Sequence, residues 1–165
     1  MSCNQKESEL MVTVYETSES GNHLTKVSGF TAVENAATIV LNPAEKFQTI
    51  SGFGGAFTES SAYLLNQLSE KNRDSIMQAY FGKEGANYSL TRTHMNSCDF
   101  SLSQYSYSPV AEDMTLEHFT IQEDQDDLIP MIKEALRVSE DGFRIIASPW
   151  TAAPWMKDNK KWVGG

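Results

Sequence analysis

The stretch SGFGGAFTESS, residues 51–61, lies where the pattern of the chain changes. Three glycines within four positions follow an extended segment, residues 46–50, and precede an apolar helical pattern that begins at Ala62. Glycine is typical of backbone that takes positive φ or that another group approaches closely. We therefore expect a strand-to-helix turn, the place where α/β folds put their sites. A tight turn without a ligand is the alternative.

Upstream of this stretch, the chain reads as short strands without helices. Residues 1–9 are polar and are expected to be disordered or to act as a tether. Runs rich in β-branched residues predict strands at 10–17, 23–27 and 37–41. Residues 10–45 therefore indicate an antiparallel β unit that is too small to stand alone.

Downstream, residues 46–165 alternate between strand and helix patterns. Strands are predicted at 47–52, 87–96 and 143–148, and helices after a Thr58 or Ser60 cap, after Ser69, and around 128–139 with Pro130 in the first turn. The order β, α, β, α, β fits parallel crossovers, so a doubly wound sheet and a (β/α)8 barrel both remain open. If the fold is a barrel, about 250 residues are expected and three strands cannot close it, so the sequence would be the truncated first part of one.

Composition excludes some classes of protein. The 165 residues carry a net charge of −9, which argues against a nucleic-acid partner, and no run is long and apolar enough to span a membrane. The acidic run at 123–127 predicts a solvated helix start. The glycines do not follow the G-x-G-x-x-G spacing of nucleotide sites, and we expect no cofactor and no metal.

The two cysteines, Cys3 and Cys98, have no metal-ligand spacing and indicate no disulfide framework. Cys98 is expected to be a buried free thiol in a strand. Cys3 follows a small residue and precedes a polar tether, as in a bacterial lipoprotein cleavage site. This pattern predicts a lipid anchor at Cys3 and an extracytoplasmic or secreted location; an incidental cysteine is the alternative.

Polar and aromatic residues follow the predicted strands. Asp99 and Phe100 come after the second strand of the α/β part, and Trp150 after the third. In a barrel, these strand ends share one rim. A carboxylate that binds paired hydroxyls, with aromatic rings over the C–H face, is typical of a sugar site. The alternatives are a turn cap for Asp99 and loop packing for Trp150.

Three further polar residues are ambiguous. Arg92 alternates with His94 along its strand, so Arg92 is either an inward cation that needs carboxylate partners or ordinary surface charge. His94, without a nucleophile partner, is interpreted as structural. Retaining glycoside hydrolysis needs two carboxylates about 5–5.5 Å apart. Glu59 lies in the first helical turn, where it can simply favour the helix dipole. The residues therefore predict a binding rim without a catalytic pair.

Four blocks of the sequence resemble the glucosylceramidase-like members of glycoside hydrolase family 30. They are GFGGAFT at 52–58, YF at 80–81, RTHMNSCDFS at 92–101 and ASPWTAAPWMK at 147–157. The resemblance implies a (β/α)8 barrel with an attached β-sandwich to which residues 10–45 contribute strands. It also implies a retaining β-glycosidase that uses one Glu as acid/base and another as nucleophile. Both are expected beyond Gly165, so no catalytic residue is assigned and the chain alone is expected to be inactive.

By the same resemblance, Asp99 binds sugar hydroxyls, Trp150 lines the same pocket, Phe100 flanks it and Arg92 lies beneath. The glycine turn is expected to start the first βα loop under this site. The implied substrate is a β-glucoside, either glucosylceramide-like or β-1,6-glucan-like, and the implied partner is the rest of the barrel. His94, where animal members often have proline, suggests a bacterial relative. The alternative is a non-catalytic carbohydrate-binding or structural half-barrel module.

Overall fold

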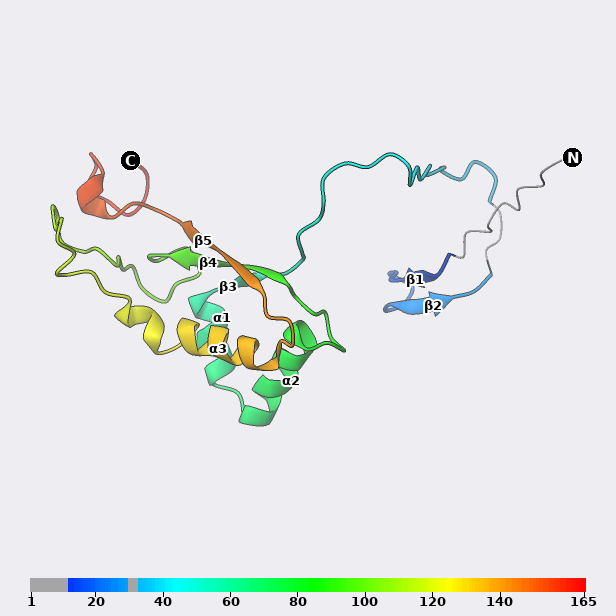
Figure 1. Cartoon of the computed structure of the whole chain (residues 1–165), viewed down its shortest axis with the longest axis horizontal. Helices are drawn as coiled ribbons and strands as arrows, with labels where there is room; N and C mark the ends of the chain where they lie inside the picture. Colours follow the sequence, from blue (N-terminus) through cyan, green and yellow to red (C-terminus); the bar gives the residue numbers. More distant parts are fainter. Residues whose placement is uncertain (1–11, 30–32) are drawn as a thin grey trace, which may run out of the picture. The chain divides into compact units, whose positions relative to one another are not determined.

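The computed structural model describes residues 12–29 and 33–165, which divide into two compact units, Met1–Phe47 and Gln48–Gly165 (Figure 1). The predicted tether at 1–9 and Cys3 lie outside the described residues. The family-based assignment of residues 10–45 to a β-sandwich stays a prediction.

The described residues of the first unit, 12–29 and 33–47, contain one strand pair. Strands β1 (Val14–Glu16) and β2 (Thr25–Val27) are antiparallel, with Val14 opposite Val27. The predicted strand at 37–41 is wrong, because this segment pairs with no described strand and its apolar side chains are exposed. A β-branched run becomes a strand only where a neighbour accepts its backbone hydrogen bonds and packs against its side chains.

The second unit is a parallel sheet with helices along one side (Figure 1). Its strands are β3 (Ala56–Phe57), β4 (Leu90–Met95) and β5 (Arg144–Pro149), paired in chain order. Its helices are α1 (Glu59–Asn66), α2 (Glu70–Phe81) and α3 (Leu128–Val138), with short 3-10 turns η1 (Gln122–Gln125) and η2 (Pro154–Met156). Three parallel strands in chain order with helices on one side fit the first units of a (β/α)8 barrel. They also fit one half of a doubly wound sheet, which changes side only where its strand order reverses.

The glycine stretch is part of the sheet region and is not the turn. Phe53 accepts the backbone N–H groups of Ser89 and Leu90 on its carbonyl oxygen at 3.0 and 3.2 Å. A Cβ at Gly54 would lie 1.8 Å from the carbonyl oxygen of Leu90, so only glycine fits there. The predicted strand at 47–52 and the glycine turn are therefore wrong: the glycines let two backbones approach, and the turn follows at Thr58.

The helix starts match the sequence patterns. Thr58 Oγ1 accepts the N–H of Ser61 at 3.2 Å, and Ser69 Oγ accepts the N–H of Asn72 at 3.3 Å. Each bond satisfies a backbone donor that the first helical turn leaves free. Helix α1 thus begins two residues after β3 ends, which places its N-terminus at the carboxyl end of the sheet.

The core lies between the sheet and the helices. The Phe57 and Phe81 rings stack with centroids 5.4 Å apart, and Phe81 lies 5.2 Å from Phe143. These rings join β3, α2 and the residue before β5. Buried apolar residues from α1, α2 and α3 complete the cluster: Ala62, Met77, Leu128, Met131, Ala135 and Val138.

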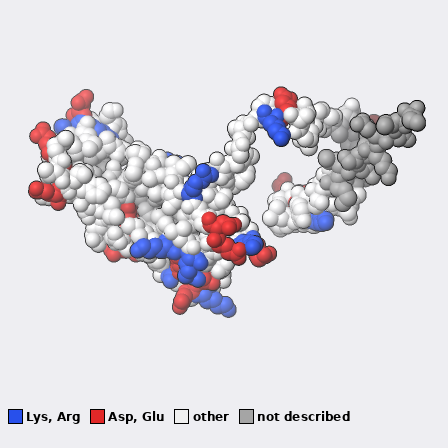
Figure 2. All heavy atoms as spheres, in the orientation of Figure 1, with Lys and Arg blue, Asp and Glu red and all other residues white. Residues whose placement is uncertain are grey.

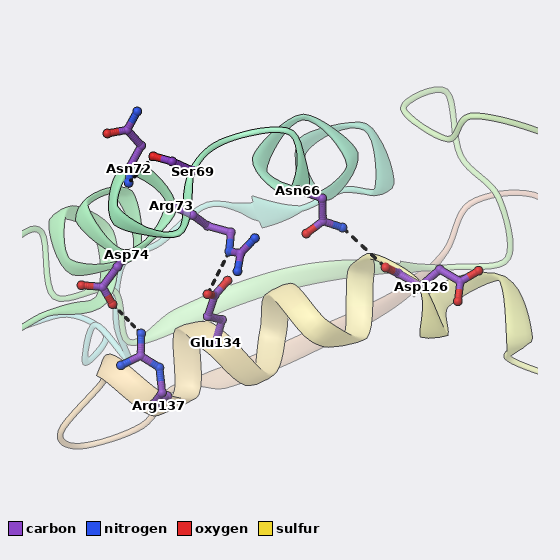
Figure 3. A network of polar contacts seen from close by, with 8 residues as sticks. All are labelled: Asn66, Ser69, Asn72, Arg73, Asp74, Asp126, Glu134 and Arg137. Carbon is purple, nitrogen blue, oxygen red and sulfur yellow. Dashed lines mark hydrogen bonds and ion pairs between the residues drawn. The ribbon is translucent and has the colours of Figure 1, made fainter.

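Ion pairs connect α2 to α3 on the outer surface. Arg73 Nε lies 2.9 Å from Glu134 Oε1, and Arg137 pairs with Asp74 (Figure 3). Figure 2 shows both signs of charge side by side over this helical part. Ion pairs near a protein surface are worth about 1 kcal/mol or less, so these pairs align the two helices while the apolar core supplies most of the stability.

Candidate functional site

The carboxyl ends of the strands meet at one edge of the sheet. Met95 pairs with Pro149 at the last register position of β4 and β5, so the residues that follow, Asn96 and Trp150, leave the sheet at the same level. Strand β3 ends beside them at Phe57 and leads through Thr58 into α1. Loops at this edge carry the functional groups of barrel proteins.

Arg92 lies on the sheet face that carries no helix. It pairs in register with Ala56, whereas the next residue of β3, Phe57, packs into the helix-side core. The Arg92 guanidinium carbon lies 4.4 Å from the centre of the Trp150 ring, and its Nη2 donates to Ser148 Oγ at 3.2 Å. No carboxylate among the described residues pairs with Arg92. The structure thus brings two of the four expected site residues together in a cation–π contact.

The rim loop, defined here as residues 96–102, starts with a strained backbone. Asn96 takes φ +62°, which is uncommon for a residue other than glycine. His94 Nδ1 lies 2.7 Å from the Asn96 carbonyl oxygen and therefore donates to it, while Asn96 Oδ1 accepts the N–H of Tyr107 at 2.9 Å. His94 is buried, and its Nε2 has no hydrogen-bond partner among the described residues, so the structural interpretation of this residue stays a prediction.

The far end of the rim loop is bonded to the N-terminus of α1. The Ser60 N–H and hydroxyl both donate to the Phe100 carbonyl oxygen, at 2.9 and 2.6 Å. Glu59 Oε2 accepts the N–H of Leu102 at 3.1 Å, and Glu59 is only 6% exposed. Both ends of the loop are therefore fixed to regular structure.

Asp99 and Phe100 form the exposed tip of the rim loop. Within the described residues the Asp99 carboxylate caps no backbone group and joins no ion pair, so the turn-cap alternative does not fit. Phe100 is 57% exposed. No contact described here joins Asp99 or Phe100 to Arg92 or Trp150. Cys98 is a free, half-buried thiol in the turn, so the expected strand position and full burial were wrong.

Sequence patterns missed a tyrosine pair behind this loop, in which Tyr105 is buried and Tyr107 half-buried. The Tyr105 and Tyr107 hydroxyls both donate to the Asp124 carboxylate, which is 4% exposed; the Tyr105 bond is 2.7 Å long. Burial, followed by the hydrogen bond and negative charge of Asp124, raises the pKa of both phenols. The signal was available in the spacing of the tyrosines, since residues two apart in extended chain share one side.

The acidic run at 123–127 is not a solvated helix start throughout. Asp124 is buried under the tyrosines, and Asp127 is buried at the N-cap of α3, where its carboxylate accepts the N–H of Leu128. Burial raises the pKa of the Asp127 carboxyl, and the nearby charges of Asp124 and Asp126 act in the same direction. Asp124 and Asp127 therefore anchor the long loop, while Glu123 and Asp126 are exposed.

No helix among residues 12–29 and 33–165 is both long and apolar enough to cross a bilayer.

The fold and the rim define the class of protein: consecutive βα units of a (β/α)8 barrel with polar and aromatic groups at the carboxyl ends of the strands. The sequence model of the glycosyl hydrolase family 30 TIM-barrel domain matches residues 50–165. The chain belongs to this family, as the sequence resemblance indicated.

Relatives and solved structures agree with this assignment. Putative glucosylceramidase 3 of Caenorhabditis elegans is 43% identical over 129 residues, 78% of this chain and 25% of the relative. Lysosomal acid glucosylceramidase of Mus musculus is 34% identical over 149 residues, 88% of this chain and 29% of the relative. The solved structure of an endo-β1,6-glucanase superposes with a TM-score of 0.70 at 36% identity, covering 88% of this chain and 31% of the glucanase. The chain thus spans less than a third of each.

Proposed function

We propose that this chain forms the sugar-binding side of a retaining β-glycosidase that acts on β-glucosides. The observation that carries the proposal is the contact of Arg92 with Trp150 at the carboxyl edge of the sheet, beside the exit of β4 toward Asp99. Relatives named glucosylceramidase and endo-β1,6-glucanase support a β-glucoside as the substrate class.

Each of the four residues has a distinct role in this proposal. The free Asp99 carboxylate accepts hydrogen bonds from two sugar hydroxyls, and the half-exposed Trp150 ring covers the C–H face of the same ring. Phe100 flanks the sugar. Arg92 lies beneath Trp150, holds its ring in place and supplies positive charge to the floor of the site.

The catalytic carboxylates are not assigned to this chain. Double displacement needs an acid/base and a nucleophile about 5–5.5 Å apart. At the ends of the described strands, Asp99 is uncommitted but Glu59 is buried and bonded to Leu102. We propose that the chain supplies binding residues and that the catalytic pair comes from other parts of the barrel.

The test uses the protein translated from the complete reading frame that contains this chain. With 4-nitrophenyl β-glucoside as substrate, Asp99→Asn and Trp150→Ala are each expected to lower kcat/KM about tenfold to a hundredfold, because a charge-assisted hydrogen bond or a stacked ring is lost. Trp150→Phe keeps an aromatic face and is expected to retain more activity. Asp141→Asn is the matched control, since Asp141 is exposed at the opposite edge of the sheet.

Unchanged kinetics in Asp99→Asn and Trp150→Ala would exclude the proposed sugar site. A complete protein that binds β-glucosides without turning them over would instead support the non-catalytic module. The rate of hydrolysis of a β-1,6-linked glucan is then compared with that of a glucosylated lipid. The faster substrate identifies the class of group on the other side of the cleaved bond.

A further inference from the structure

Glu59 is a buried carboxylate whose position demands an explanation. It is the first residue of α1 and only 6% exposed, although a negative charge near a helix N-terminus does not need to be buried. Burying a carboxylate costs free energy unless hydrogen bonds compensate for the lost water. The partner in the described structure is the backbone N–H of Leu102, 43 residues further along the chain.

The bond from Glu59 closes the rim loop. At the start of the loop, the His94 imidazole holds the Asn96 carbonyl, where the backbone takes its positive φ. At the end, the Glu59 carboxylate accepts the N–H of Leu102. The neighbouring Ser60 donates its N–H and its hydroxyl to the carbonyl oxygen of Phe100. Between these ends the loop has internal bonds, from Cys98 N–H to Ser101 Oγ and from Ser101 N–H to the Cys98 carbonyl.

We propose that Glu59 is a positioning residue that fixes the rim loop and thereby the Asp99 carboxylate for sugar binding. This inference rests on the proposed function. Within residues 12–29 and 33–165 the Asp99 side chain makes no hydrogen bond or ion pair, so its placement depends on the loop backbone on either side. A carboxylate on the rigid first turn of a helix, aimed at the backbone just beyond Phe100, supplies that constraint.

Two variants separate this role from a simple helix-dipole role. Glu59→Gln keeps an oxygen that accepts the Leu102 N–H and removes the charge, whereas Glu59→Ala removes both. If Glu59 positions the loop, Glu59→Ala raises KM about tenfold with little change in kcat, and Glu59→Gln raises it only about two- to threefold, since a neutral acceptor bonds less strongly. Glu70 is the matched control: it occupies the first position of α2, is exposed and does not contact the rim loop.

Glu70→Ala and Glu70→Gln are expected to leave both constants unchanged. A double-mutant cycle adds a specific readout: in an Asp99→Asn background, Glu59→Ala should change KM by no more than about twofold, because the residue it positions is already disabled. An equal KM increase in Glu59→Gln and Glu59→Ala would show that charge at the helix start matters, and would overturn the proposal. A hundredfold fall in kcat with KM unchanged in Glu59→Gln would make Glu59 a catalytic acid and also overturn it.

Hydrogen exchange decides the same point without a substrate. In Glu59→Ala, the amide of Leu102 and its neighbours in the rim loop are expected to exchange at least tenfold faster than in the wild type, with Glu59→Gln close to the wild type. Unchanged protection of Leu102 in Glu59→Ala would overturn the tether. Absence of β-glucoside turnover by the wild-type protein would count against the proposed function alone, since the exchange rates would still decide the role of Glu59.

Discussion

At the scale of single residues, Asp124 is the group on which the long loop after β4 depends. It accepts two phenolic hydroxyls, from Tyr105 and Tyr107, in a buried position. The backbone of Tyr107 also donates to the side chain of Asn96, which starts the rim loop. The buried carboxylate of Asp124 therefore stabilises the rim loop indirectly: it fixes Tyr107, and Tyr107 in turn bonds to Asn96.

The hydroxyls of Tyr105 and Tyr107 are predicted to resist alkaline titration. An ordinary tyrosine ionises near pH 10, but the phenolates of Tyr105 and Tyr107 would be desolvated next to a carboxylate, so their pKa values are raised and both hydroxyls stay protonated above pH 10. A raised pKa in the folded protein contributes stability that is fully present below about pH 10 and is lost as the pH rises above it. Denaturant midpoints from pH 8 to 11, with tyrosinate absorbance, measure both effects.

Tyr107→Phe serves as the control for this titration, because it removes one of the two hydroxyls that donate to Asp124. This variant should lose less stability above pH 10 than the wild type. Ionisation of all six tyrosines near pH 10 in protein that remains folded would contradict the expectation.

Residue roles were only partly predictable from the sequence. The alternation of Arg92 with His94 shows that they share a side of β4, but one strand cannot reveal which side carries the helices. Pairing with Ala56 decides this, because Phe57 next to it packs into the core. The role of Asp124 was missed for a related reason. An acidic run is typical of a solvated surface, and the sequence does not show that two tyrosines distant from it donate hydrogen bonds to Asp124.

At the scale of elements, the approach of residues 53–55 to β4 fixes where the sheet begins. The absence of a side chain at Gly54 lets the Leu90 carbonyl come within 1.8 Å of the position of a Cβ. We expect Gly54→Ala to lower the free energy of unfolding by about 2 kcal/mol or more, because two backbones must move apart. Thermal unfolding followed by circular dichroism measures the change.

The neighbouring Gly55→Ala is the matched control. A Cβ there meets Tyr88 Cε2 at 3.6 Å, an ordinary contact, so the expected change is within about 1 kcal/mol of zero. Equal effects of the two substitutions would show that loss of glycine flexibility, and not the close approach, determines stability at this edge.

Helices were predictable and the first strand was not. Thr58 and Ser69 are local signals, since a cap satisfies backbone donors within three residues. Strands depend on partners distant in the chain. Residues 37–41 have strand composition but no described partner, while the glycine stretch has turn composition but lies against β4. Local composition therefore misassigned both.

At the scale of the whole molecule, the second unit leaves an apolar groove open along β3. The groove measures about 600 Å³ and is lined by residues of α1, α2 and β3, among them Leu64, Tyr80 and Phe57. Leu64 and Tyr80 are also largely exposed. In a closed barrel this edge would face further strands and helices. The choice between a barrel and a doubly wound sheet, open in the sequence, is decided by the match of residues 50–165 to the family's TIM-barrel domain, which the strand order and the one-sided helices fit.

This openness predicts the behaviour of the 165-residue chain on its own. We expect no turnover of 4-nitrophenyl β-glucoside, because its described strand ends offer one uncommitted carboxylate, Asp99, where the reaction needs two. We also expect strong fluorescence with an apolar dye such as ANS, because the groove is uncovered. Turnover that persists in an independently purified preparation, and is lost in Asp99→Asn, would show that the expectation is wrong.

The chain-order pairing of β3, β4 and β5 also gives the unit a direction of assembly. Strand β4 pairs with β3 and strand β5 with β4, so a chain emerging from the ribosome can add βα units one after another. The aromatic cluster closes late, because Phe57 and Phe81 are joined by Phe143 only after α3 has been synthesised. A pause in translation between Phe81 and Phe143 would therefore hold a nascent chain with its first two helices formed and its core unfinished, which is a state that chaperones recognise.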